Sequence, residues 1–142
     1  MSQIQKYHQK ISGPILDRID LHVEMQAVEF PDLTGTMTQE SSPEIKKRVL
    51  LAREIQSKRF HTPEKTNAIM SSREIKKYCA TSERGKIFLE KAMKELELSA
   101  RGYYKVLKIA RTIADLNASE TIEEGHIAEA VQYRTLDRNW FH

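Results

Sequence analysis

The sequence predicts a mainly α-helical domain, a bundle of five helices preceded by a short remnant of an α/β core. After residue 42, five stretches place apolar residues three and four positions apart, as amphipathic helices do. Residues 19–25 alone alternate apolar and polar side chains, as in a strand with one covered face. Because one strand cannot satisfy its backbone groups or cover its apolar face, we expect the rest of its sheet to lie outside this sequence.

Length and composition favour one soluble globular unit. The chain has 142 residues, of which 30% are charged and 39% hydrophobic, enough for one core but not comfortably for two. Its net charge of +3, from 23 basic and 20 acidic residues, is too small to indicate nucleic-acid binding by itself. No apolar run approaches the length of a membrane span, and no signal-peptide pattern opens the chain. We therefore expect a cytoplasmic protein with no membrane partner.

The first 30 residues contain a turn, a short helix and the strand. Ser12-Gly13-Pro14 forms a turn that places a proline, with its fixed φ, at the first position of a helical segment. On the polar face of the following strand, we expect His22 to be exposed. Residues 31–42 have linker composition, rich in Thr and Ser. The predicted organisation is a core remnant at residues 1–30, a linker at 31–42 and a helical domain at 43–142.

Capping residues indicate where the five helices start. A Ser or Thr side chain accepts a hydrogen bond from a free N–H of the first turn, and a Glu three residues later completes a capping box. The predicted starts are, in chain order, Ser41 or Ser42 with Pro43, Ser71 with Glu74, Ser82, Ser99, and Thr121 with Glu124. Five helices with short connections can pack as a small bundle.

The fourth helix, residues 99–116, divides most clearly into two faces. Its apolar arc consists of Tyr103, Val106, Leu107, Ile109, Ala110, Ile113, Ala114 and Leu116. Its opposite arc consists of Arg101, Lys105, Lys108 and Arg111, with Tyr104, Thr112 and Asp115. In the first turn, Arg101 lies against the positive end of the helix dipole, an unfavourable place unless the site serves an anion such as phosphate. The spacing leaves two interpretations open: an anion site at Arg101, or a solvated basic face.

Several patterns that support catalysis are missing from the sequence. No Gly-rich loop ends in Gly-Lys-Ser or Gly-Lys-Thr, so the chain has no nucleotide cradle of its own. The five histidines are scattered without ligand spacing, and no metal site is predicted. Cys79, the only cysteine, is interpreted as a small buried hydrophobe on a helix. The chain by itself is therefore not predicted to be a complete enzyme.

Two stretches resemble one branch of the AAA+ ATPases. Residues 11–25, ISGPILDRIDLHVEM, resemble the segment that ends the ATPase core in magnesium-chelatase subunit I–like proteins, particularly the competence-protein ComM group. Residues 98–116, LSARGYYKVLKIARTIADL, followed by HIAEAVQYRTLDR at 126–138, are similar to the C-terminal helical domain of that group. The likeness extends over nearly the full chain. It implies the end of an ATPase core plus the whole helical lid, with the Walker A and Walker B segments upstream of Met1.

The resemblance also implies roles for two arginines. Arg18 occupies the place of an arginine finger, which reaches into the ATP site of a neighbouring subunit; the alternative is a surface ion pair with Asp17 or Asp20. Arg101 matches the sensor 2 arginine, the lid residue that senses the γ-phosphate, either in its own subunit or in the neighbour's. ATP and Mg²⁺ are the implied cofactors of the parent protein. We expect the chain alone to bind neither and to be inactive.

The implied parent is a hexameric ring ATPase that couples ATP binding and hydrolysis to the remodelling of DNA, as in competence. The same branch includes metal-chelatase subunits, whose rings drive metal insertion into a porphyrin, and this is the second interpretation. A third interpretation is a stand-alone helical interaction module. A Walker A segment in the upstream reading frame would support the motor, whereas a natural start codon at Met1 would support the module.

Overall fold

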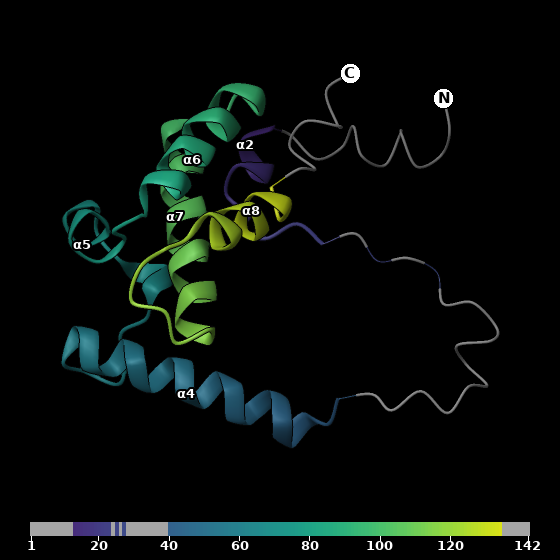
Figure 1. Cartoon of the computed structure of the whole chain (residues 1–142). Coiled ribbons are helices and arrows are strands. Elements are labelled where there is room, and N and C mark those ends of the chain that lie inside the picture. The colour runs from purple at the N-terminus through teal and green to yellow at the C-terminus, as the bar shows by residue number, and fades with distance from the viewer. Residues whose placement is uncertain (1–12, 24, 26, 28–39, 135–142) are drawn as a thin grey trace.

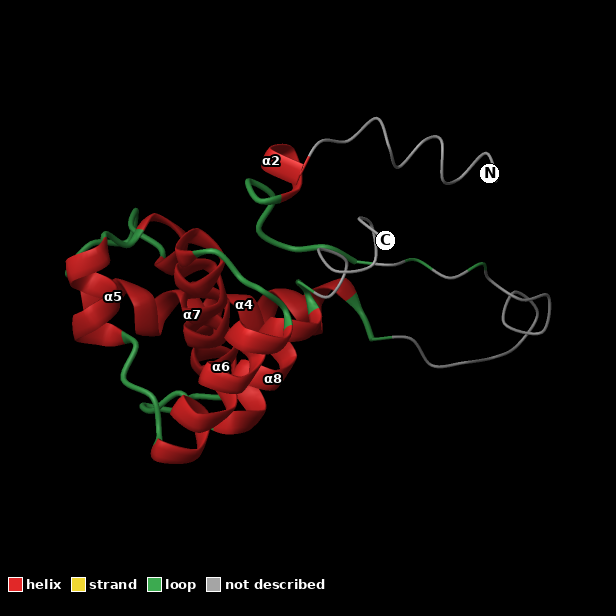
Figure 2. Ribbon diagram, turned by 90° about the horizontal axis from the view of Figure 1, so that it is seen from above, coloured by secondary structure: helices red, strands yellow, loops and turns green. Residues whose placement is uncertain are grey.

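The computed structural model describes residues 13–23, 25, 27 and 40–134, and these are predominantly helical. A short helix, α2 (Gly13–Leu16), is followed by the bundle helices α4 (Ser42–Phe60), α5 (Ser72–Tyr78), α6 (Glu83–Glu95), α7 (Ala100–Leu116) and α8 (Glu124–Gln132). A 3₁₀ turn, η1 (Asn67–Ile69), links α4 to α5. The five predicted bundle helices and the short helix after the Ser-Gly-Pro turn are therefore confirmed. Figure 2 shows α2 standing at the margin of the helical bundle.

Helix α7 is the central element of the bundle (Figure 1). It packs against α4, α5 and α8, and α8 in turn packs against α6. On the predicted apolar arc of α7, Val106, Ala110 and Ala114 are completely buried. Their small or branched side chains let neighbouring helices approach closely, and burying this face contributes to the hydrophobic stabilisation of the bundle. Leu116, at the end of the same arc, is instead exposed.

The capping predictions hold at four helices and fail at the fifth. Ser82 and Ser99 accept hydrogen bonds from backbone N–H groups of α6 and α7. Glu74 and Glu44 accept the N–H of Ser71 and of Ser41, each at 2.8 Å.

Helix α8 starts at Glu124, so the predicted capping box of Thr121 is wrong. Its N-cap is Glu123, whose N–H donates to Nδ1 of His126 at 3.0 Å. The reason lies just upstream, where Ile122 forms a parallel β-bridge with Thr81. Because the N–H and carbonyl of Ile122 already bond to Ala80 and Ser82, both at 3.0 Å, the chain turns helical only after this bridge.

The predicted strand at residues 19–25 is not formed among the described residues. Residues 19–23 run as a loop, and the only β-pairing in the described part of the chain is the bridge between Thr81 and Ile122. The N–H of His22 donates to the carbonyl of Tyr133 at 2.9 Å. Its side chain is buried, which corrects the expectation that it is exposed. A period-two pattern forms a strand only beside a partner strand, and the described residues contain none next to this segment.

The polar arc of α7 is not the solvated face that one interpretation expected. Lys105, Arg111 and Asp115 are all buried. Asp115 accepts hydrogen bonds from Nη1 of Arg59 on α4 at 2.7 Å and from Nδ2 of Asn67 on η1 at 2.7 Å. It also accepts Nε–H of Arg111 at 3.1 Å. Figure 1 shows α4 crossing one end of α7, and this ion cluster fastens the two helices there.

Most of the predicted linker, residues 31–39, and the final residues 135–142 lie outside the described part of the chain. Among the helices that the structure describes, none combines the length and the apolar character needed to cross a membrane.

Candidate functional site

A hollow of about 920 Å³ lies between the loop after α2, helix α7 and the end of α8. It brings together the two arginines that the sequence singled out, Arg18 and Arg101, which both line it. Apolar and aromatic groups form much of the remaining wall: Leu21, Tyr104, Ile109, Ile113 and Tyr133. A hollow of this composition suits a ligand with two parts: an anionic group, which the two guanidinium groups would bind, and a flat, largely apolar group, which the rest of the wall would contact.

Arg18 lies in the turn that ends α2. Its N–H donates to the carbonyl of Ile15 at 2.9 Å, so the backbone is fixed by a local turn. Its Nη1 donates to the carbonyl of Pro14 at 3.0 Å, and the residue is exposed. A guanidinium has five N–H donors, and this contact uses one of them. No ion pair of Arg18 with Asp17 or Asp20 is present in the described residues, where those carboxylates pair with other cations.

Arg101 is in the first turn of α7, as the sequence predicted. Ser99 is the N-cap, and its Oγ accepts the N–H of Gly102 at 3.0 Å. The Arg101 side chain is 54% exposed, and its Nε lies 3.9 Å from Oδ2 of Asp17. That separation exceeds hydrogen-bond distance, so the guanidinium is only loosely paired. Exposure and weak pairing leave it able to turn towards an anion.

The other cations of α7 are engaged by the protein itself. Nζ of Lys105 lies 2.8 Å from Oδ1 of Asp20 and donates to the carbonyl of Ile19 at 3.1 Å. Nζ of Lys108 donates to the carbonyl of Ala68 at 2.8 Å. These two lysines connect α7 to neighbouring segments through hydrogen bonds. Arg18 and Arg101 differ from them because their guanidinium groups are exposed and weakly paired.

Asp17 and Arg134 hold the site together. Sequence reasoning considered Asp17 only as an ion-pair partner of Arg18, and it missed Arg134. Asp17 accepts a hydrogen bond from Oγ of Ser99 at 3.2 Å. Arg134, which is buried, donates from Nη1 to the carbonyl of Ile19 and places Nη2 3.9 Å from Oδ1 of Asp17. Both residues are charged and lie within the stretches that carry the family resemblance, but no periodicity connects residues so far apart in the chain. For Arg134, the indication in the sequence was an arginine that follows the apolar face of α8.

The remaining chemically reactive groups do not add to this site. Within residues 13–23, 25, 27 and 40–134, no three His, Cys, Asp or Glu side chains are grouped to hold a metal ion. Burial raises the pKa of the Cys79 thiol to about 11, which keeps it protonated and unreactive at neutral pH. The chemistry that the hollow offers is therefore the binding of negatively charged oxygens by two guanidinium groups.

Comparisons with known proteins agree with the resemblance seen in the sequence. Residues 39–134 match the family described as magnesium chelatase, subunit ChlI C-terminal, and residues 1–33 match magnesium chelatase, subunit ChlI. The chain is 41% identical over 137 residues to the competence protein ComM of Haemophilus influenzae, which covers 96% of this chain and 26% of that protein. It is 40% identical over 141 residues to YifB of Escherichia coli, covering 99% of this chain and 27% of that protein.

A more distant relative, Mb2921c of Mycobacterium bovis, is 32% identical over 134 residues, covering 92% of this chain and 26% of that protein. The chain thus spans about a quarter of the length of these relatives. The match over residues 39–134 includes every helix of the bundle. The chain therefore belongs to the magnesium chelatase subunit ChlI family, of which residues 39–134 form the C-terminal region, and is a ComM-like member of it.

Proposed function

We propose that this chain is the helical lid, with the end of the ATPase core, of a ring-forming ATPase that uses ATP to remodel DNA. The observation that supports this proposal best is that Arg18 and Arg101, exposed and weakly paired, line one hollow. The family membership gives both residues a role in ATP hydrolysis by analogy.

The N-terminal segment supports the presence of a larger core. Ile15, Leu21 and Val23 expose 50%, 49% and 61% of their surface, and Met25 is 86% exposed. Four neighbouring apolar side chains in one short segment form a surface that another protein layer could cover. The rest of an α/β sheet is the covering layer that the alternating pattern of residues 19–25 favours.

In the proposed mechanism, Arg18 acts across a subunit boundary. Its planar guanidinium can hold two phosphate oxygens at once and offset the negative charge that develops during phosphoryl transfer. Its position at an exposed turn, with one donor engaged locally, suits a group that must reach outward. Because Arg101 lines the same hollow, we propose that both arginines meet the phosphates of the same nucleotide, that of the neighbouring subunit.

The two guanidinium groups fit the phosphates of ATP, and Arg101 in addition stands at a helix N-terminus, where the dipole attracts anions. Mg²⁺ finds no matching set of ligands among the described residues. We therefore propose no role for these residues in binding Mg²⁺. The contribution of this chain is to orient the two arginines, and to exclude water through the apolar wall around them.

The substrate of the ring is proposed to be DNA because the relative from Haemophilus influenzae is a competence protein. A metal-chelatase motor is the second candidate, favoured by the name of the matching family. Stimulation of ATP hydrolysis by DNA separates these two in the intact polypeptide. We expect duplex or branched DNA to raise its ATPase rate and a porphyrin with Mg²⁺ to leave it unchanged; the opposite result would establish the chelatase assignment.

A separate experiment tests the lid assignment. The 142-residue chain, titrated with ATP and Mg²⁺ in a calorimeter, should show no tight binding and no turnover above a buffer blank, because it has no phosphate loop. Micromolar affinity, or turnover, would contradict the assignment.

A further inference from the structure

One carboxylate, that of Asp17, joins the turn of Arg18 to the start of α7. Its Oδ1 accepts the Oγ–H of Ser99 at 3.2 Å. Its Oδ2 lies 3.9 Å from Nε of Arg101, and its Oδ1 lies 3.9 Å from Nη2 of Arg134. Three groups from the bundle, two of them cationic, therefore converge on the residue that directly precedes Arg18.

The residues after Arg18 are fastened to the same helices. The carbonyl of Ile19 accepts hydrogen bonds from Nζ of Lys105 at 3.1 Å and from Nη1 of Arg134. The carboxylate of Asp20 lies 2.8 Å from the same lysine. Lys105 and Arg134 are 9% and 1% exposed, and a buried cation is costly unless it is paired. Lys105 and Arg134 therefore hold the turn in place, and the turn in return supplies the oxygens that make their burial tolerable.

A further contact extends this attachment along the chain. The N–H of His22 donates to the carbonyl of Tyr133 at 2.9 Å, next to the end of α8. On both sides of Arg18, the backbone is therefore bound to the lid bundle. The Arg18 side chain itself makes one local hydrogen bond and is otherwise exposed.

We infer that Asp17 is a positioning residue, which fixes the turn of Arg18 to the N-terminal end of α7 so that Arg18 moves with the lid. The inference rests on the proposed function, because it gives Asp17 its role through Arg18. A displacement of α7 that follows from phosphate binding at Arg101 is then delivered to Arg18 through Asp17, together with the contacts of Ile19 and Asp20 to Lys105. The turn of Arg18 and the start of α7, which carries Arg101, then move together, so the two arginines are not independent contacts.

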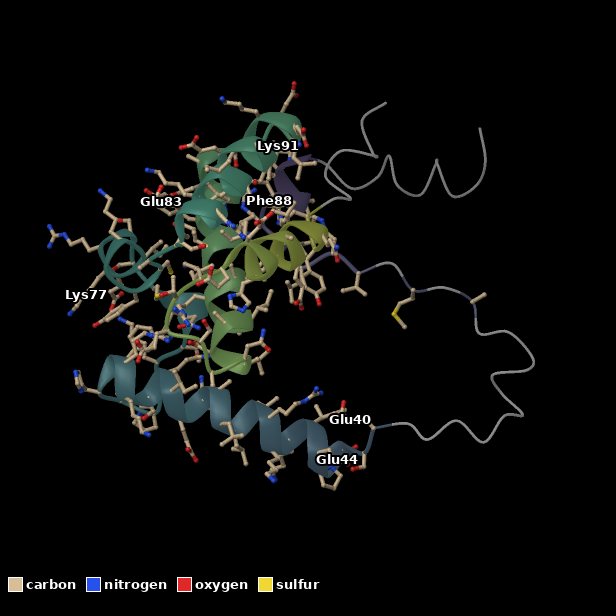
Figure 3. All side chains as sticks on the ribbon, in the orientation of Figure 1. Glu40, Glu44, Lys77, Glu83, Phe88 and Lys91 are labelled. Carbon is tan, nitrogen blue, oxygen red and sulfur yellow. The ribbon has the colours of Figure 1, made fainter. Side chains whose placement is uncertain are left out.

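The attachment itself is testable in the 142-residue chain by hydrogen exchange. Asp17→Asn removes the charge that faces Arg101 and Arg134, and should speed exchange at the amides of Arg18 and His22 by about tenfold or more. Glu40→Gln is the matched control, because Glu40 lies just before α4 (Figure 3) and pairs with Arg48 at an exposure similar to that of Asp17, 42% against 37%. Unchanged exchange in Asp17→Asn would overturn the inference.

The role in catalysis is tested in the intact polypeptide by steady-state ATP hydrolysis. Displacing a reacting or stabilising group by about 1 Å costs roughly 100-fold in rate. We expect Asp17→Asn to lower kcat about 10- to 100-fold with KM for ATP unchanged, and Glu40→Gln to leave both unchanged. Asp17→Glu keeps the charge, and we expect it to lower kcat by a smaller factor than Asp17→Asn does. If Asp17→Asn fails to fold, an unaltered kcat in Asp17→Glu overturns the inference.

A double variant shows whether Asp17 acts through Arg18. Asp17→Asn combined with Arg18→Ala should hydrolyse ATP no more slowly than Arg18→Ala alone, because a missing side chain cannot be misplaced further. A rate that falls further would mean that Asp17 acts independently of Arg18, and would overturn the inference. If Arg18→Ala alone is unimpaired, the proposed function fails and the inference with it. If Arg18→Ala is impaired and Asp17→Asn is not, only the inference fails.

Discussion

At the scale of single residues, the buried cluster around Asp115 is the structure's clearest source of stability from charge. The side chain of Asp115 is fully buried and receives hydrogen bonds from Arg59, Asn67 and Arg111. Burial lowers the pKa of Arg111, and the neighbouring Asp115 carboxylate opposes that shift and favours the charged guanidinium. The cluster is therefore stable only while all of its members are present.

Replacing Asp115 by Ala should destabilise the chain by about 3–5 kcal/mol, because it leaves Arg111 buried without its counter-ion. The measurement is the free energy of unfolding in urea. Glu40→Ala, which breaks the exposed pair with Arg48, is the control and should cost less than about 1 kcal/mol. Equal costs for the two variants would show that the cluster is not a stabilising unit.

Arg101 should behave in the opposite way. It is half exposed, lies against the unfavourable end of the helix dipole and is only loosely paired with Asp17. Arg101→Ala should therefore change the free energy of unfolding by only a few tenths of a kcal/mol, in either direction. In the intact polypeptide, it should weaken binding of a non-hydrolysable ATP analogue much more than binding of ADP. A large loss of stability, or equal weakening of both nucleotides, would assign Arg101 a structural or general electrostatic role.

The residue scale also shows where sequence reasoning is limited. A helical wheel correctly placed Val106 and Ala110 in the core and Arg101 at an exposed helix start. It placed Lys105 and Arg111 on the polar arc, for which a solvated face was one interpretation, and both are buried. A wheel describes one helix, whereas burial of these cations depends on carboxylates and carbonyls that other segments bring to them.

At the scale of elements, the helix starts depend on local capping, and α5 provides a test through pH. The hydrogen bond from Lys65, followed by those from the N–H and hydroxyl of Ser71, lowers the pKa of Glu74 from 4.5 to about 2. Since the pKa is depressed in the folded state, the ionised Glu74 side chain stabilises the fold. This contribution is fully present above about pH 4.5 and is lost as the pH falls towards 2.

The variant Glu74→Gln should therefore lose more stability relative to the wild type at pH 7 than at pH 3. Urea unfolding at both pH values measures the difference. Glu44→Gln is the matched variant, because Glu44 makes the same capping box at α4 without a lysine partner, and its pH effect should be smaller. A loss in Glu74→Gln that is the same at both pH values would contradict the role of the charge.

Helix starts were predicted correctly where they depend on contacts between residues close together in the sequence. Ser71, Ser82 and Ser99 cap helices through contacts within three residues, so a single sequence is enough to find them. The predicted strand at residues 19–25, which is not formed among the described residues, and the start of α8 both depend on pairing with distant backbone. The β-bridge of Ile122 to Thr81 decides where α8 begins, and no local pattern encodes it.

At the scale of the whole molecule, the candidate site forms where the two ends of the described chain meet. The contact of Arg134 with Ile19 joins residues 115 positions apart, and it completes the attachment of the Arg18 turn to the bundle. The sequence could name Arg18 and Arg101 from their motifs. It could not show that both line one hollow, because that follows from the packing of α7 and α8 against the N-terminal segment.

The central proposal is that Arg18 completes the ATP site of a neighbouring subunit, and mixing two inactive variants of the intact polypeptide tests it most directly. Arg18→Ala alone should assemble and bind ATP but hydrolyse it about 10³- to 10⁵-fold more slowly. A variant without the Walker A lysine should also be inactive, yet it retains Arg18. Mixed rings should recover ATP hydrolysis, because one subunit supplies the phosphate loop and its neighbour supplies the guanidinium. Unimpaired hydrolysis by pure Arg18→Ala, or a mixture no more active than its components, would contradict the account.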